Sequence, residues 1–144
     1  MKEFLNVYGI WLGFMVVASV LAIIYSIGMN KKNNRKKAKF LEENPNAARI
    51  FMTMKGAVVN EVVQIITVNG EEPIKFTEKL KGGVYAKPGS ATLEVNYTYT
   101  RPGVMYKSVS ESTGIVSIEV EVEANKSYKI GYDRKAQDFT FEEI

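Results

Sequence analysis

The chain has 144 residues, contains neither cysteine nor histidine, and carries a formal net charge of +3. The missing residue types exclude disulfide bonds, cysteine nucleophiles, cysteine-bound zinc and histidine general bases. The positive charge is concentrated near the N-terminus, because residues 1–44 carry a net charge of +4 and residues 45–144 a net charge of −1. A nucleic-acid-binding domain is expected to carry positive charge on its folded surface, so nucleic acid is not an expected partner.

The first element is an uncharged segment, residues 4–30. About 20 helical residues cross a hydrocarbon core of about 30 Å. Tyr8 and Trp11 near one end and Tyr25 near the other fit the membrane interfaces. A cleaved signal peptide is the alternative, but its apolar core is usually only about 7–15 residues and a small-residue cleavage site follows it. We therefore expect residues 1–30 to form an uncleaved, single-pass transmembrane helix.

The expected topology depends on the charges beside this segment. Only Lys2 precedes it, whereas six basic residues follow it: Lys31, Lys32, Arg35, Lys36, Lys37 and Lys39. Positively charged flanks stay in the cytoplasm, which predicts an outside N-terminus and a cytoplasmic C-terminal domain; an extracytoplasmic domain is the alternative. Residues 31–46 are expected to form a polar connector, of which residues 36–43 can extend the helix. Its basic side chains are also expected to attract anionic membrane lipid, at about 1 kcal/mol each.

Small residues form two stripes on the expected helix, one with Gly9 and Gly13 and one with Ala18, Ala22 and Ser26. At about 100° per residue, position 18 lies on the face opposite position 9. Small residues let helices approach closely in lipid. The stripes predict contact with other membrane-protein subunits or self-association, although such spacings also arise by chance.

Residues 47–144 show the alternation of half-buried β-strands. Turn residues such as Asn69-Gly70 and Pro102-Gly103 separate the apolar runs. About seven or eight short strands at this spacing predict an antiparallel β-sandwich. The expected strands are residues 50–54, 62–68, 83–87, 91–100, 104–110, 116–122, 128–132 and 139–141.

One hairpin register follows from parity. Val122 and Tyr128 are both expected to face the core, which requires an odd-length loop of residues 124–126 if the two strands pair. The expected pairs are Val122 with Tyr128, Val120 with Ile130, Ile118 with Tyr132 and, on the outer face, Glu121 with Lys129.

Several short motifs resemble those of PEGA-type surface-associated domains. They are residues 68–70 (V-N-G), 83–85 (G-V-Y), 88–95 (P-G-S-A-T-L-E-V) and 125–128 (N-K-S-Y). The resemblance covers residues 62–133, although Ser90-Ala91 stands where the family has a basic or histidine residue and no PEGA tetrapeptide is present. It implies a small sandwich that acts as a non-catalytic binding or spacer module, and many such modules are extracytoplasmic.

The candidate functional residues of the domain are few. Tyr99, Arg101 and Tyr106 are a possible ligand platform for a sugar or a peptide, with core packing of the tyrosines as the alternative. Glu119, Glu121 and Glu123 lie in a row that diverges, so a solvated face is favoured over a cation site. No phosphate-binding loop is present, and no cofactor or metal is expected.

These observations predict a membrane-anchored, non-catalytic interaction or scaffold subunit that binds a protein partner or stabilises a membrane complex. The alternative is an extracytoplasmic carbohydrate or cell-wall binding module. A hydrolase is the third and weakest reading, because no spacing singles out a catalytic pair.

Overall fold

The computed structural model describes residues 2–144, with side chains from Asn6 onward. It contains two compact units, one ending at Lys39 and the other comprising Phe40–Ile144. The first unit is helical throughout its described residues and belongs to α1 (Lys2–Glu43). From Asn6 onward α1 is long and apolar enough to cross a membrane, properties that a signal sequence near the N-terminus also has.

Helix α1 continues through the basic tract that was expected to form part of a connector. The tract contains helix-favouring lysine, arginine and alanine residues and no glycine or proline. The helix ends before Pro45, which disfavours helical backbone in the residue before it. Asn44 closes the last turn, because its backbone N–H and its side-chain amide both donate to the Phe40 carbonyl, at 2.8 and 3.0 Å.

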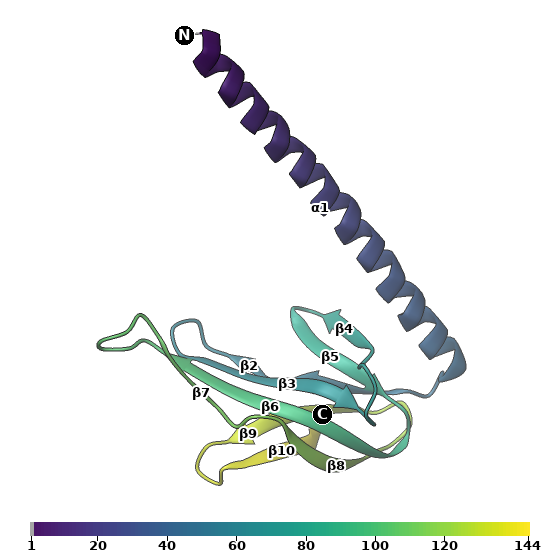
Figure 1. Ribbon diagram of the computed structural model, residues 1–144. Helices are drawn as coiled ribbons and strands as arrows, with labels where there is room; N and C mark the ends of the chain where they lie inside the picture. The colour runs from purple at the N-terminus through teal and green to yellow at the C-terminus, as the bar shows by residue number, and fades with distance from the viewer. Residues whose placement is uncertain (1) are drawn as a thin grey trace. The chain divides into compact units, whose positions relative to one another are not determined.

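The second unit contains two sheets (Figure 1). The first has the strand order β10-β9-β1-β5-β4, and the second has the order β2-β3-β6-β7 with β8 also paired to β6. The strands of the first sheet are β1 (Ala48–Met52), β4 (Lys75–Glu78), β5 (Lys81–Ala86), β9 (Ser127–Asp133) and β10 (Asp138–Glu143). Those of the second are β2 (Met54–Lys55), β3 (Asn60–Val68), β6 (Gly89–Arg101), β7 (Val109–Ser112) and β8 (Val116–Val122).

The two sheets share one apolar core. Its fully buried side chains come from both of them: Ile50, Val84 and Ile130 from the first, and Val63, Ile65, Leu93 and Val95 from the second. The expected alternation is confirmed on β6, where Leu93, Val95 and Tyr97 are buried, and at the end of β8, where Val120 and Val122 are buried. At the start of β8 it is not, because Val116 is exposed. The outward residues Glu119, Glu121 and Glu123 are exposed, as a solvated face requires.

A smaller aromatic cluster includes the last helical turn. The ring of Phe40 lies 6.4 Å from that of Tyr85, and Tyr85 lies 4.8 Å from Phe76. Phe76 in turn meets Phe51 edge to face at 5.2 Å. The last turn of α1 therefore belongs to the β-rich unit through apolar contacts, not only through the chain connection.

The expected hairpin between residues 116–122 and 128–132 is wrong. Strand β8 pairs with β6, and β9 pairs with β10 and, in parallel, with β1, so the two strands lie in different sheets. Glu121 lies opposite Ser90, and Lys129 lies opposite Phe51 and Glu142. Val122 and Tyr128 do both face the core, but from opposite sheets. The alternation of inward and outward residues requires only that both side chains face the same core. A crossover between two sheets meets this requirement as well as a hairpin does.

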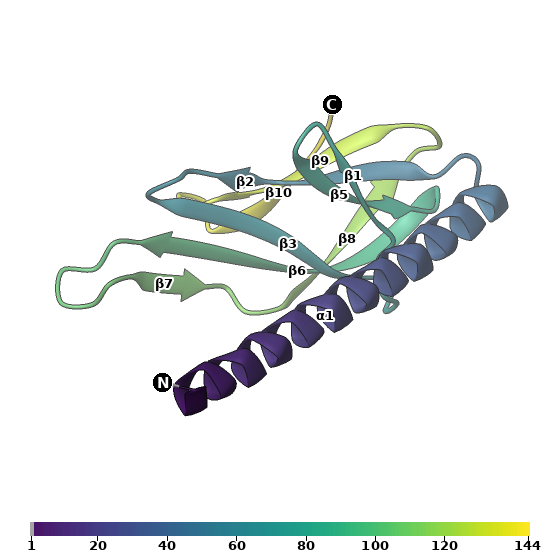
Figure 2. The ribbon, with the colours of Figure 1, turned by 90° about the horizontal axis from the view of Figure 1, so that it is seen from above.

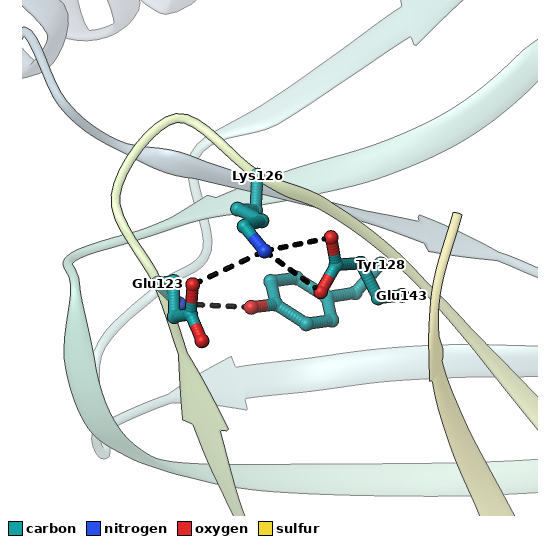
Figure 3. A network of polar contacts seen from close by, with 4 residues as sticks. All are labelled: Glu123, Lys126, Tyr128 and Glu143. Carbon is teal, nitrogen blue, oxygen red and sulfur yellow. Dashed lines mark hydrogen bonds and ion pairs between the residues drawn. The ribbon is translucent and has the colours of Figure 1, made fainter.

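The crossover is held by a polar network (Figure 3). The amino group of Lys126 lies 2.9 Å from a carboxylate oxygen of Glu143 and 3.2 Å from one of Glu123. The backbone N–H of Glu123 donates to the Tyr128 hydroxyl at 2.9 Å. These contacts join the end of β8, the start of β9 and the last residue of β10.

Three other segments differ from the expected strands. The expected strand 50–54 is divided at Thr53 into β1 and β2, which belong to different sheets. Residues 102–108 form a loop, and the following strand, β7, begins only at Val109. Strand β4 was not expected, since its four residues bury only Phe76 and no glycine marks the turn that follows. That turn is part of the candidate site.

Candidate partner-binding groove

The second unit contains a groove of about 430 Å³. It lies where the chain leaves β1, passes Thr53 and enters β2 of the other sheet. Thr53 is buried there, and its hydroxyl donates to the Ile130 carbonyl at 2.6 Å. The residues that line the groove are Phe51, Met52, Thr53, Met54, Lys55, Val62, Val63, Gln64, Leu80, Lys81, Gly82, Lys129 and Ile144. We call it the Leu80 groove.

The Leu80 groove has an apolar wall and cationic side chains. Met54, Leu80 and Ile144 expose large apolar side chains beside it. Lys55, Lys81 and Lys129 contribute amino groups, and no aspartate or glutamate is among its described lining residues. An exposed apolar surface beside polar groups is typical of an interaction site. Its positive charge favours an acidic partner.

Leu80 itself is the clearest anomaly of the site. Its side chain is fully exposed (100%) at the two-residue turn between β4 and β5. Both turn residues have positive φ, 48° for Lys79 and 65° for Leu80. Such turns favour Asn-Gly, since a branched side chain at positive φ costs about 1–2 kcal/mol. Two unfavourable features at one residue indicate a function for its side chain.

The edge of β3 beside the groove is only partly paired. The Val63 N–H donates to the Thr53 carbonyl at 2.8 Å, but the Ile65 N–H has the weaker sulfur acceptor of Met52, at 3.4 Å. Strand β2 pairs with β3 only at Val62 and Glu61. An incompletely paired edge can accept hydrogen bonds from an extended segment of another chain. The groove is therefore suited to non-covalent recognition.

The three residues of the expected tyrosine platform lie on β6 and in the loop that follows it. Tyr99 is half-buried, and the cation over its ring is Arg134, whose guanidinium carbon lies 3.9 Å from the ring centroid. Arg101 is exposed at the end of β6, and Tyr106 is exposed in the following loop. Sequence reasoning missed Arg134, because the β9–β10 turn that carries it comes close to Tyr99 only through sheet packing.

A polar cavity of about 180 Å³ lies next to Tyr97. Tyr97 is only 6% exposed, and its hydroxyl has no hydrogen-bond partner among the described residues. Burial raises the pKa of this hydroxyl above its ordinary value, and the nearby Glu61 carboxylate raises it further. Lys55, Lys129 and Glu142 also line the cavity. A small hydroxylated ligand could hydrogen-bond to these groups.

The expected sites on α1 lie on its described residues. A Cβ added at Gly9 or Gly13 would meet nothing within 4 Å, so both positions leave open space on the helix surface. The Ser26 hydroxyl, beside Ala18 and Ala22 in the second stripe, donates to the Ala22 carbonyl at 2.9 Å. Five of the six basic residues border one shallow groove along the helix, together with Gly28: Lys31, Lys32, Arg35, Lys36 and Lys39.

Among the described residues, no group of three or more aspartate or glutamate side chains could hold a metal ion. No family model, curated protein or solved structure matches the chain.

Proposed function

We propose that the chain is a membrane-anchored, non-catalytic interaction subunit that holds a protein partner at the membrane. The observation that carries this proposal is the Leu80 groove, with a fully exposed leucine on a strained turn. In this proposal α1 crosses the bilayer once and the β-rich unit is a β-sandwich that recognises the partner. The role agrees with the binding modules that the turn motifs resemble.

The basic residues that follow the apolar part of α1 support a cytoplasmic position for the domain, by the positive-inside rule. The stripe of Gly9 and Gly13, which leaves open space on the helix, supports a helix–helix contact in the same complex. Replacing both glycines by leucine is expected to release co-purifying subunits that bind through the helix. Unchanged co-purification would remove the helix from the proposal.

Photo-crosslinking tests the groove directly. A photoreactive residue replaces Met54, which is exposed beside the groove, in the full-length chain in its native membranes. A discrete crosslinked adduct of partner and chain is expected. Leu80→Gly in the same chain should abolish the adduct, whereas Lys79→Gly, the matched change in the same turn, should retain it.

The outcome with Lys79→Gly makes the test specific. Both glycine substitutions relieve positive φ, so a difference between them reports the leucine side chain and not the turn. Equal adduct yields from wild-type, Leu80→Gly and Lys79→Gly chains would contradict the groove as the binding site. Absence of any adduct at position 54 would contradict it as well.

One observation favours a second candidate function, an extracytoplasmic carbohydrate or cell-wall binder. It is the polar cavity beside the unpartnered Tyr97 hydroxyl, which suits a hydroxylated ligand. Retention of the full-length protein on polysaccharide or peptidoglycan, lost in Tyr97→Phe, would support this function. Equal retention of both proteins would count against the cavity as the binding site.

A further inference from the structure

The loop between β6 and β7 exposes a second apolar cluster, separate from the Leu80 groove. Its three consecutive side chains are almost wholly exposed: Val104 (101%), Met105 (90%) and Tyr106 (76%). The loop lies at the end of β6, the longest strand, and projects past the neighbouring strand ends in both views (Figures 1 and 2). Three adjacent apolar side chains at a hairpin tip indicate a contact that removes them from water.

The tip is built as a firm projection. Below it, β6 and β7 are paired from Arg101 opposite Val109 to Thr98 opposite Ser112. The hydroxyls of Thr100 and Ser110 add a cross-strand hydrogen bond of 2.9 Å. Within the loop, a Cβ added to Gly103 would collide with the carbonyl oxygen of Tyr106, so only glycine fits this close turn.

The charged residues nearest the tip in the sequence are positive. Arg101 and Lys107 flank the apolar residues, and no aspartate or glutamate occurs between Glu94 and Glu111 in the sequence. An apolar tip with cationic flanks complements a bilayer surface that contains anionic lipid: the apolar side chains enter the acyl boundary and the cations meet the headgroups. An acidic protein surface would match the charges but not a projecting apolar tip.

We propose that the β6–β7 tip is a second membrane contact, which inserts Val104, Met105 and Tyr106 into an anionic lipid surface. This inference rests on the proposed anchoring of the chain by α1, which keeps a bilayer always near the domain. Helical residues 31–43 span about 20 Å, whereas the 13 residues of β6 span about 43 Å. The span of β6 therefore exceeds that of the helical segment between the apolar part of α1 and the domain.

The chain has a single tryptophan, Trp11, so fluorescence can observe the two membrane contacts separately. The full-length protein is reconstituted into vesicles of phosphatidylcholine, with or without phosphatidylglycerol, whose acyl chains carry bromine as a quencher. Wild-type Trp11 reports the anchor. The Trp11→Phe, Tyr106→Trp variant reports the tip. Leu80→Trp in the Trp11→Phe background is the matched control, since it places tryptophan at another exposed apolar hairpin turn.

The expected result is quenching at positions 11 and 106 but not at position 80. Phosphatidylglycerol should strengthen quenching at position 106 severalfold, and Val104→Asp with Met105→Asp should abolish it. If position 106 is not quenched while Trp11 is, the tip proposal fails and the anchor stands. If Trp11 is not quenched, the anchor itself fails. Equal quenching at position 106 in neutral vesicles would overturn the role of anionic lipid.

Discussion

Tyr97 of β6 stacks on Tyr132 of β9 across the two sheets, with ring centroids 4.2 Å apart and planes 20° from parallel. Phe139 of β10 meets Tyr132 edge to face at 5.0 Å, so the stack extends into the last strand. The three rings pack against one another beside the core. The Tyr97 hydroxyl is buried there, and no described group forms a hydrogen bond with it.

Tyr97→Phe should raise the stability of the folded domain by about 1 kcal/mol at neutral pH, because it keeps the ring stack and removes a buried hydroxyl without a partner. Urea unfolding of the full-length protein in detergent measures the change. Tyr106→Phe, which alters an exposed tyrosine, is the control and should leave the stability unchanged. A loss of stability in Tyr97→Phe would mean that the hydroxyl is bound after all.

The same substitution should change the response to alkaline pH. The pKa of Tyr97 is raised above 10.0 in the folded chain, first by burial and then by Glu61. Above about pH 10 the unfolded chain releases this proton while the folded chain keeps it. The contribution of Tyr97 to the free energy of unfolding is therefore unchanged below that pH, and stability falls as pH rises through the folded pKa. Unfolding curves up to about pH 11 should therefore show a shallower alkaline loss in Tyr97→Phe. Parallel curves for the two proteins would contradict the shift.

Leu80→Gly should stabilise the fold while it weakens partner binding. Glycine adopts the φ of 65° without strain, so a gain of about 1 kcal/mol is expected, measured as a higher midpoint of thermal unfolding. Lys79→Gly should give a similar gain at its φ of 48° without loss of binding. A destabilised Leu80→Gly protein would show that the leucine supports the fold instead.

Lys126→Met should destabilise the crossover between the sheets modestly, since Lys126 joins Glu123 and Glu143. Hydrogen bonds to these carboxylates, first Glu143 and then Glu123, raise the pKa of the Lys126 amino group above 10.5. This contribution to stability is fully present below about pH 10.5 and is lost as pH rises through the raised pKa of the folded chain. The unfolding midpoint should fall, and the difference from wild type should shrink as salt is added, because the pairs are exposed. Lys87→Met, at an exposed loop position, is the control, and an equal effect there would remove the network as the cause.

The side of the membrane can be read from a single introduced cysteine, because the chain has none of its own. Glu142→Cys lies on an exposed position of β10. A cytoplasmic domain predicts that a membrane-impermeant thiol reagent labels it only after lysis. Labelling in intact cells would reverse the proposed topology and favour the carbohydrate-binding alternative. Glu119→Cys, exposed on the other sheet, should give the same answer.

The alternation of residues predicted most of the strands and their buried faces, as on β6 and at the end of β8, because it depends only on the period of the strand. It did not predict which strands pair. Residues 124–126 could have closed a hairpin, and the choice of a crossover depends on β1 lying between β5 and β9. That arrangement is a property of the whole fold and leaves no local mark in the sequence.

The candidate site was the part least accessible from sequence. Leu80 looks like an ordinary apolar residue until its φ and its exposure are known. The groove collects residues from β1, β2, β3, β5, β9 and the C-terminal residue, which no sequence spacing connects. The two stripes of small residues on α1 could be predicted from the sequence, because the helical period alone determines which residues share a face.

The place of β1 in the first sheet has a mechanical consequence. Four residues separate the end of α1 from β1, which lies between an antiparallel neighbour, β5, and a parallel one, β9. Tension applied through the helix would enter the domain at the N-terminal end of this inner strand. Hydrogen bonds that run across a strand then carry the load together, instead of opening one after another. The domain is thus joined to the helix through a strand that is held by hydrogen bonds on both sides.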